Sequence, residues 1–144
     1  PIPRSFHDNF IVTGDVAGQV KPTTGGGVIW GGICAMIAGR VGAEAVEARS
    51  PRRGFLSNYE ILWRKKLGKE IKFTLLARKI ADRLSDETVD KIFQSVTESD
   101  LQEELSLEGD IDFQARTILN VARKKDILKI LLSSASDLIG YLRE

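Results

Sequence analysis

The sequence has few of the features that assign a chemistry at once. Its 144 residues include one cysteine, Cys34, and one histidine, His7. One cysteine excludes an internal disulfide, and this pair supplies too few ligands for a zinc site. Lys and Arg number 21 against 20 Asp and Glu, so no overall field favours nucleic acid. We expect no metal and no nucleic-acid partner, with Cys34 as a small buried residue.

The chain also lacks a long hydrophobic run and an initiator methionine. The Gly-rich uncharged stretch 25–39 has 15 residues, whereas a membrane-spanning helix needs about 20 apolar residues. It opens Pro1-Ile2-Pro3, without a basic segment followed by an apolar one. We expect a cytoplasmic protein, soluble or peripheral to a membrane, and a piece of something longer.

Composition changes along the chain. Hydrophobic residues make up 42% and charged residues 28%, the balance of an ordinary folded domain. Residues 1–49 hold most of the glycines and few charges, whereas residues 50–144 are rich in charge and have helical periodicity nearly throughout. We therefore predict a division after residue 49, followed by an all-helical region.

The first region predicts a strand, a loop and a helix. Residues 10–13 form a short apolar, β-branched run that predicts a buried strand. Residues 16–27 form a loop, and a helix is expected over 28–48 because apolar residues recur every four positions. These are Ile29, Ile33, Ile37, Val41 and Ala45. A second row, Gly31, Ala35 and Gly39, predicts close approach of another backbone.

The second region predicts five helices from capping residues and apolar periodicity. A long helix is expected from Ser50-Pro51 to about Leu84. Four shorter helices follow, and their expected starts are Ser85, Ser99, Asp112 and Asp126. Gly109 is expected to end the second of these, and the last is expected to carry Leu138 and Leu142.

Residues 13–28 carry the pattern that points to chemistry. A strand that ends at Gly14-Asp15 places a carboxylate at a sheet edge, where open α/β folds bind ligands. Three glycines, 25–27, directly precede the helix and leave its first amides uncovered by side chains. Such amides carry a partial positive charge that favours an anion or a polarised carbonyl. The pattern predicts a pocket for a polyhydroxylated, electron-rich ligand, with hydroxyl groups donating to the carboxylate.

Gly14-Asp15 followed by Pro22-x-x-Gly25-x-Gly27 resembles the second FAD fingerprint of flavoproteins in the glutathione-reductase-like class. That class includes aromatic hydroxylases and geranylgeranyl reductases. Hydroxylases usually have a histidine where this chain has Gly18. The sequence of residues 14–27 is more similar to that of archaeal-type geranylgeranyl reductases. The helical tail is similar to theirs too.

The resemblance implies a role for each residue of the motif. Asp15 would bind a ribityl hydroxyl of FAD, and the three glycines would supply amides at the pyrimidine edge of the flavin ring. The implied cofactor-binding set is Gly14, Asp15, Pro22, Thr24, Gly25, Gly26, Gly27 and Val28. No catalytic residue is assigned.

The resemblance also implies the fold class and the function. Residues 1–49 would be the C-terminal part of an α/β FAD-binding domain, and residues 50–144 a helical C-terminal region, so the chain is expected to be mainly α. The parent would be an FAD-dependent oxidoreductase that reduces C=C bonds of geranylgeranyl or related isoprenoid chains, with NAD(P)H as one reductant. Its substrate would be a prenyl lipid. The alternatives are a fragment of a flavin monooxygenase and an autonomous helical interaction module without cofactor.

The family's first fingerprint, the G-x-G-x-x-G that binds the FAD pyrophosphate, is absent from this sequence. We therefore expect the 144 residues alone to hold FAD weakly and to catalyse nothing. Two further features keep two interpretations each. Lys21 either touches a phosphate or the reduced flavin, or is a solvated loop lysine. The basic cluster 64–72 either meets anionic lipid headgroups at a membrane or forms a solvated face.

Overall fold

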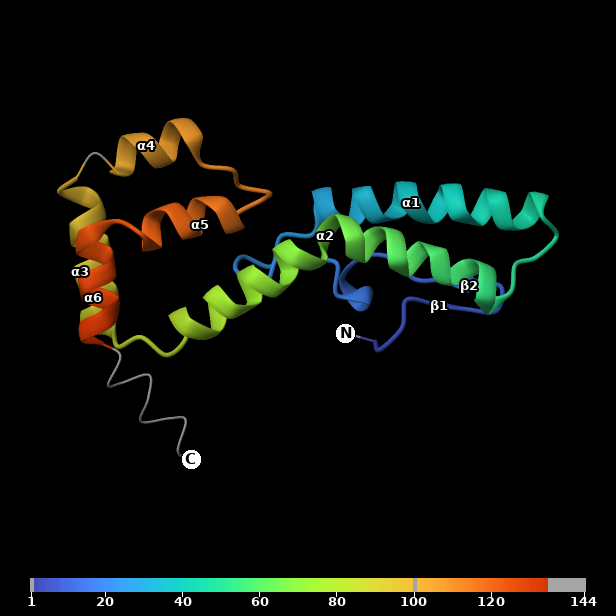
Figure 1. The fold of residues 1–144 in the computed structure, drawn as a ribbon, viewed down its shortest axis with the longest axis horizontal. Helices are drawn as coiled ribbons and strands as arrows, with labels where there is room; N and C mark the ends of the chain where they lie inside the picture. The colour runs from blue at the N-terminus through green and yellow to red at the C-terminus, as the bar shows by residue number, and fades with distance from the viewer. Residues whose placement is uncertain (1, 100, 135–144) are drawn as a thin grey trace, which may run out of the picture. The chain divides into compact units, whose positions relative to one another are not determined.

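The computed structural model describes residues 2–99 and 101–134. Within them lie six α-helices, one 3-10 helix and a two-stranded sheet (Figure 1), so the predicted mainly α class is confirmed. The chain packs as two compact units, residues 1–75 and 76–144, and each is described by itself. The predicted division after residue 49 rests on composition and resemblance, and it stays a prediction.

The first unit opens with a hairpin, β1 (Phe6–His7) and β2 (Phe10–Ile11), paired antiparallel with Phe6 opposite Ile11. Asn9 takes a left-handed conformation, φ 58°, at the turn between the strands. The prediction of a buried strand over 10–13 is wrong, because β2 pairs only with β1 and the side chain of Phe10 is 57% exposed. The chain then forms the 3-10 helix η1 (Asp15–Ala17) inside the predicted loop.

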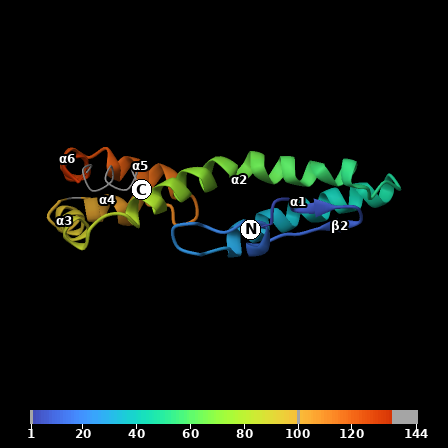
Figure 2. The same cartoon turned by 90° about the horizontal axis from the view of Figure 1, so that it is seen from below.

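Helix α1 (Val28–Glu47) runs antiparallel beside the part of the long helix α2 (Arg53–Ala81) that belongs to this unit (Figures 1 and 2). The predicted extent of α1 is confirmed. Its buried side chains are Trp30, Cys34, Val41 and Ala45. This row differs from the predicted one, because residues four apart drift around a helix of 3.6 residues per turn. Ile29 accordingly lies off the buried face and is 49% exposed.

The start of α2 is set by a distant residue. We predicted Ser50-Pro51 as its beginning, but the helix starts at Arg53. The Asp8 Oδ1 atom accepts a hydrogen bond from the Arg53 backbone N–H at 2.6 Å. This carboxylate satisfies one of the amide donors that a helix start leaves without an intrahelical partner. Inward-facing residues of α2 follow helical spacing, and the buried ones include Leu56, Tyr59, Trp63 and Leu67.

The second unit holds the shorter helices α3 (Asp86–Thr97), α4 (Leu101–Glu108), α5 (Ala115–Ala122) and α6 (Lys125–Ser133). Ser85 caps α3 as predicted, since its Oγ accepts from the Thr88 N–H at 3.3 Å. The expected cap at Asp112 is wrong. Asp110 Oδ1 instead accepts from the amides of Asp112 and Phe113, each at 2.8 Å, in the turn before α5. Leu138 and Leu142 lie outside the described residues.

Helix α1 passes a test of length and composition for a membrane span. Its 20 residues are long and apolar enough to cross a membrane by length and composition. Among the residues that the structure describes, it is the one helix that does so. The sequence expectation rested on a shorter uncharged stretch. Since core helices of soluble proteins pass the same test, this property alone assigns no membrane position.

Candidate functional site

A tight backbone turn presents Asp15 to solvent. Gly14 and Gly18 flank η1 with φ values of 87° and 74°, a region that glycine enters without strain. The Ala17 N–H donates to the Gly14 carbonyl at 3.0 Å, and the Gly18 N–H donates to the Asp15 carbonyl at 2.8 Å. The Asp15 side chain is exposed. The turn therefore fixes the backbone of the carboxylate while leaving its oxygens accessible.

The same carboxylate lies against the start of α1. A Cβ placed on Gly27 would be 2.6 Å from Asp15 Oδ1, closer than real Cβ contacts allow. Gly27 precedes the first helical residue, and no side chain caps the helix there. The first helical hydrogen bond at this end runs from the Gly31 N–H to the Gly27 carbonyl, 2.7 Å. The structure thus brings Asp15 to the glycine-started helix, and their role in binding stays a prediction.

The loop before α1 is closed by Lys21. Its backbone N–H donates to the Gly26 carbonyl at 3.0 Å, and its carbonyl accepts from the Gly25 N–H at 2.8 Å. The Lys21 side chain is 8% exposed. Its Cε lies 2.8 Å from where a Cβ of Gly26 would stand. The reading of Lys21 as a solvated loop residue is therefore wrong, and Gly26 leaves the space that this side chain occupies.

The remaining residues of the predicted set lie in the same loop and at the first position of α1. Val28 is 89% exposed. Thr24 is also exposed, and its Oγ1 accepts from the Gly26 N–H at 3.4 Å. Pro22 is half-buried. The predicted residues are thus gathered on one stretch of backbone, with an accessible face.

Sequence reasoning missed the polar network that holds this loop to α2. The Gly14 N–H donates to Gln19 Oε1 at 2.8 Å, and Gln19 Nε2 donates to the Tyr59 hydroxyl at 2.7 Å. The Tyr59 hydroxyl donates to the Val12 carbonyl at 3.1 Å. Gln19 and Tyr59 are fully buried. Burial raises the pKa of Tyr59, although the hydrogen bond with Gln19 opposes that shift. Nothing in the sequence links a loop glutamine to a helical tyrosine 40 residues later.

A second network ties the amino-terminal segment to α2. Glu60 Oε2 accepts from the Ser5 backbone N–H at 3.0 Å and from the Ser5 hydroxyl at 3.1 Å. Trp63 Nε1 donates to Ser5 Oγ at 3.0 Å, and Arg64 Nε lies 2.8 Å from Glu60 Oε1. Burial opposes ionisation of Glu60, but the Ser5 and Arg64 interactions outweigh it and lower the pKa of Glu60. Both networks hold the motif-bearing segment in place.

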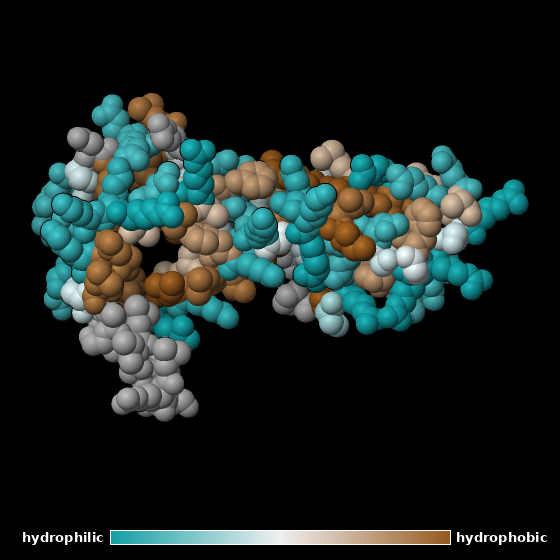
Figure 3. All heavy atoms as spheres, in the orientation of Figure 1, coloured by the Kyte–Doolittle hydropathy of each residue, from teal (hydrophilic) through white to brown (hydrophobic). Residues whose placement is uncertain are grey.

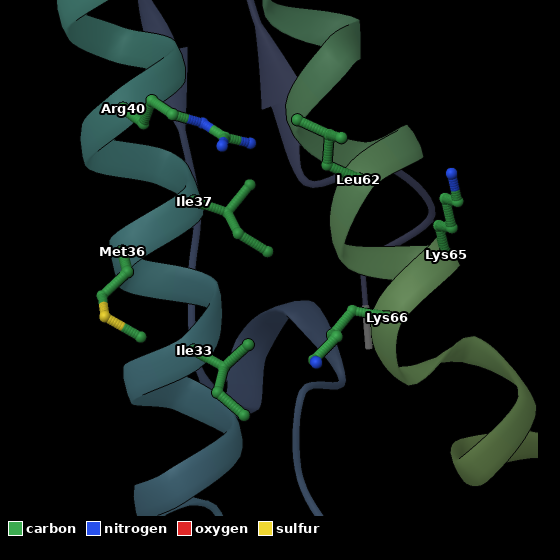
Figure 4. Close-up of a pocket in the computed structure, with 7 residues that line it drawn as sticks. All are labelled: Ile33, Met36, Ile37, Arg40, Leu62, Lys65 and Lys66. Atoms are coloured by element: carbon green, nitrogen blue, oxygen red, sulfur yellow. The ribbon is translucent and has the colours of Figure 1, made fainter.

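An open groove of about 620 Å³ separates α1 from α2. Its lining residues are Ile33, Met36, Ile37, Arg40, Leu62, Lys65 and Lys66. Ile37 on α1 points toward Leu62 on α2 (Figure 4). Apolar side chains gather over these two helices between hydrophilic ones (Figure 3). We predicted Ile33 and Ile37 as core, but they are half-buried walls of this groove.

Comparison with known proteins finds relatives that are named as lipid reductases. It is 50% identical over 101 residues to the digeranylgeranylglycerophospholipid reductase 2 of Methanothermobacter thermautotrophicus, which covers 70% of this chain and 26% of that protein. It is 33% identical over 129 residues to the digeranylgeranylglycerophospholipid reductase 2 of Methanopyrus kandleri, covering 90% of this chain and 32% of that protein. No family model and no solved structure matches the chain.

The resemblance to a geranylgeranyl reductase family is therefore confirmed. More particularly, the chain belongs to the family of digeranylgeranylglycerophospholipid reductases. It spans about a quarter to a third of the length of these relatives.

Proposed function

We propose that this chain forms the ribityl-side and ring-side half of an FAD site in a reductase of isoprenoid C=C bonds. The names of the relatives support the reductase class and a digeranylgeranyl glycerophospholipid as the substrate. The observation that carries the cofactor assignment is the position of the Asp15 carboxylate, whose Oδ1 lies 2.6 Å from where a Cβ of Gly27 would stand at the uncapped start of α1. When bound, FAD supplies the hydride chemistry, and the protein positions it.

The residues present fit such a cofactor. The exposed Asp15 carboxylate is an acceptor for sugar-alcohol hydroxyls, and a hydrogen bond to a charged group is about twice as strong as a neutral one. The amides at the start of α1 have no capping side chain, so their partial positive charge is available to an electron-rich ring edge. Gly27 keeps this face free of a Cβ.

The other half of the site lies outside this chain in our proposal. The sequence has no G-x-G-x-x-G to hold a pyrophosphate. We therefore expect the 144-residue chain to bind FAD only weakly. Titration of the isolated chain with FAD checks this, and micromolar binding with a perturbed flavin spectrum would contradict the half-site proposal.

The direct test uses a chimaera in which this chain replaces the matching part of the M. thermautotrophicus reductase. Asp15→Asn in the chimaera removes the charged acceptor and should weaken FAD binding by about 10- to 100-fold, because hydrogen bonds to charged groups contribute about 1.5–3 kcal/mol. Asp90→Asn, an exposed change on α3, is the matched control and should leave the affinity unchanged. Equal FAD affinity of both variants would refute the role of Asp15 and favour a cofactor-free helical module.

A further inference from the structure

The groove between α1 and α2 combines an apolar floor with a basic rim. Ile33, Ile37 and Leu62 supply hydrocarbon surface to it. Arg40 reaches from α1 toward α2, and Lys66 reaches from α2 toward α1 (Figure 4). Its volume, about 620 Å³, lies in the range of small-molecule sites, about 300–1,000 Å³. Every lining residue belongs to the first compact unit, so the groove is a feature of one packed body.

The cations of the rim have little compensation from acidic groups. Arg40 Nε lies 3.9 Å from Glu44 Oε1, and both side chains are more than half exposed, an arrangement that contributes little stability. Lys65 and Lys66 form no ion pair with any residue that the structure describes. No acid is among the lining residues. The groove therefore offers three positive groups to a ligand that brings its own negative charge.

We propose that this groove binds one molecule of an anionic phospholipid. The phosphate would lie against Arg40, Lys65 and Lys66, and the first carbons of a chain would cover Ile37 and its apolar neighbours. A free inorganic anion would leave the floor exposed, and a neutral apolar ligand would leave the cations without a partner. The choice of a phospholipid rests on the proposed function, but the site is separate from the Asp15 motif and its binding does not require flavin.

The test is calorimetric titration with a short-chain phosphatidylglycerol below its micelle concentration. It is made on the 144-residue chain and on the chimaera, with circular dichroism to establish that each variant is folded. Short-chain phosphatidylcholine and inorganic phosphate are the comparison ligands. The double variant Lys65→Gln/Lys66→Gln removes two rim charges. Its matched control is Lys69→Gln/Lys72→Gln, which removes two charges from the same helix but from a different cavity.

We expect phosphatidylglycerol to bind more tightly than either comparison ligand. The rim variant should lose at least about tenfold in affinity, because each basic side chain near an anionic lipid contributes about 1 kcal/mol, and the control should change by less than about twofold. Equal losses in the two variants would show unspecific attraction and overturn the proposal. Binding to the chain but not to the chimaera would show that protein covers the groove, and would overturn it too.

Flavin titration separates this proposal from the preceding one. The rim variant should keep the FAD affinity of the unmodified chimaera, and Asp15→Asn should keep its phosphatidylglycerol affinity. Loss of lipid binding in Asp15→Asn would contradict two separate sites. An unchanged FAD affinity in Asp15→Asn, with lipid binding still dependent on the rim, would refute the flavin half-site alone.

Discussion

Tyr59→Phe removes one oxygen atom but two hydrogen bonds, and it should therefore lower the free energy of unfolding of the first compact unit markedly. The hydroxyl accepts from Gln19 Nε2 and donates to the Val12 carbonyl. Since Gln19 and Tyr59 are fully buried, no water replaces the missing partner without opening the core. A buried polar group left without a partner costs about 1–3 kcal/mol, so the two groups together predict a loss of about 2–4 kcal/mol.

Urea unfolding followed by tryptophan fluorescence measures this loss in the right part of the chain. The protein has two tryptophans, Trp30 and Trp63, and both are buried in the first unit. Ser57→Ala is the matched control, because that hydroxyl donates only to the local Gly54 carbonyl among the described contacts. We expect a change of under about 0.5 kcal/mol for the control. A Tyr59→Phe loss no larger than the control's would refute the network as an anchor.

Alkaline pH provides an independent test of the same hydroxyl. Burial raises the pKa of Tyr59, so its stabilisation is complete below the ordinary tyrosine pKa of about 10 and is lost as pH rises through the folded value. Burial also raises the pKa of Cys34, to about 11. This buried thiol therefore also contributes a loss of stability as pH rises. Tyr59→Phe should therefore flatten the alkaline loss of stability in part. An unchanged slope would contradict the assignment.

Four further outcomes follow from the first unit. Gly27→Ala should weaken FAD binding by the chimaera while costing little stability, because the new Cβ displaces the exposed Asp15 carboxylate. Gly32→Ala should stabilise the isolated chain by about 0.5–1 kcal/mol in urea unfolding, since its Cβ meets open space. Glu60→Gln should lower the free energy of unfolding by about 2 kcal/mol at neutral pH. The lowered pKa of Glu60 predicts a loss of stability as pH falls below about 4.5, and the variant should not show this loss. An unchanged dependence of stability on acid pH would contradict this. Cys34 should react with a thiol reagent only on unfolding, because it is fully buried and its pKa is raised; fast labelling of the folded chain would disagree.

Local patterns in the sequence predicted most helices and the cap at Ser85. The apolar periodicity gave the extent of α1, and the capping role of Ser85 was found because its partner, Thr88, is three residues away. The approach of the Asp15 carboxylate to Gly27 agrees with the predicted neighbourhood of the carboxylate and the helix start, although the predicted buried strand before Asp15 is absent.

The errors concern interactions between distant residues. The face that α1 buries depends on where α2 and the loop pack, so periodicity alone placed Ile33 in the core although it lines an open groove. The role of Gln19 depends on Tyr59, and a single sequence holds no signal for that pairing. The burial of Lys21 likewise depends on the space beside Gly26.

The carboxylate of Asp8 has a consequence for how the first unit assembles. The Asp8 side chain accepts from the Arg53 amide, and the Asn9 N–H donates to the Pro51 carbonyl at 2.7 Å. The first turn of α2 is thus completed by a hairpin that lies more than 40 residues earlier in the chain. Removing that hairpin should therefore fray the opening turn of the long helix, because the Arg53 amide loses its acceptor.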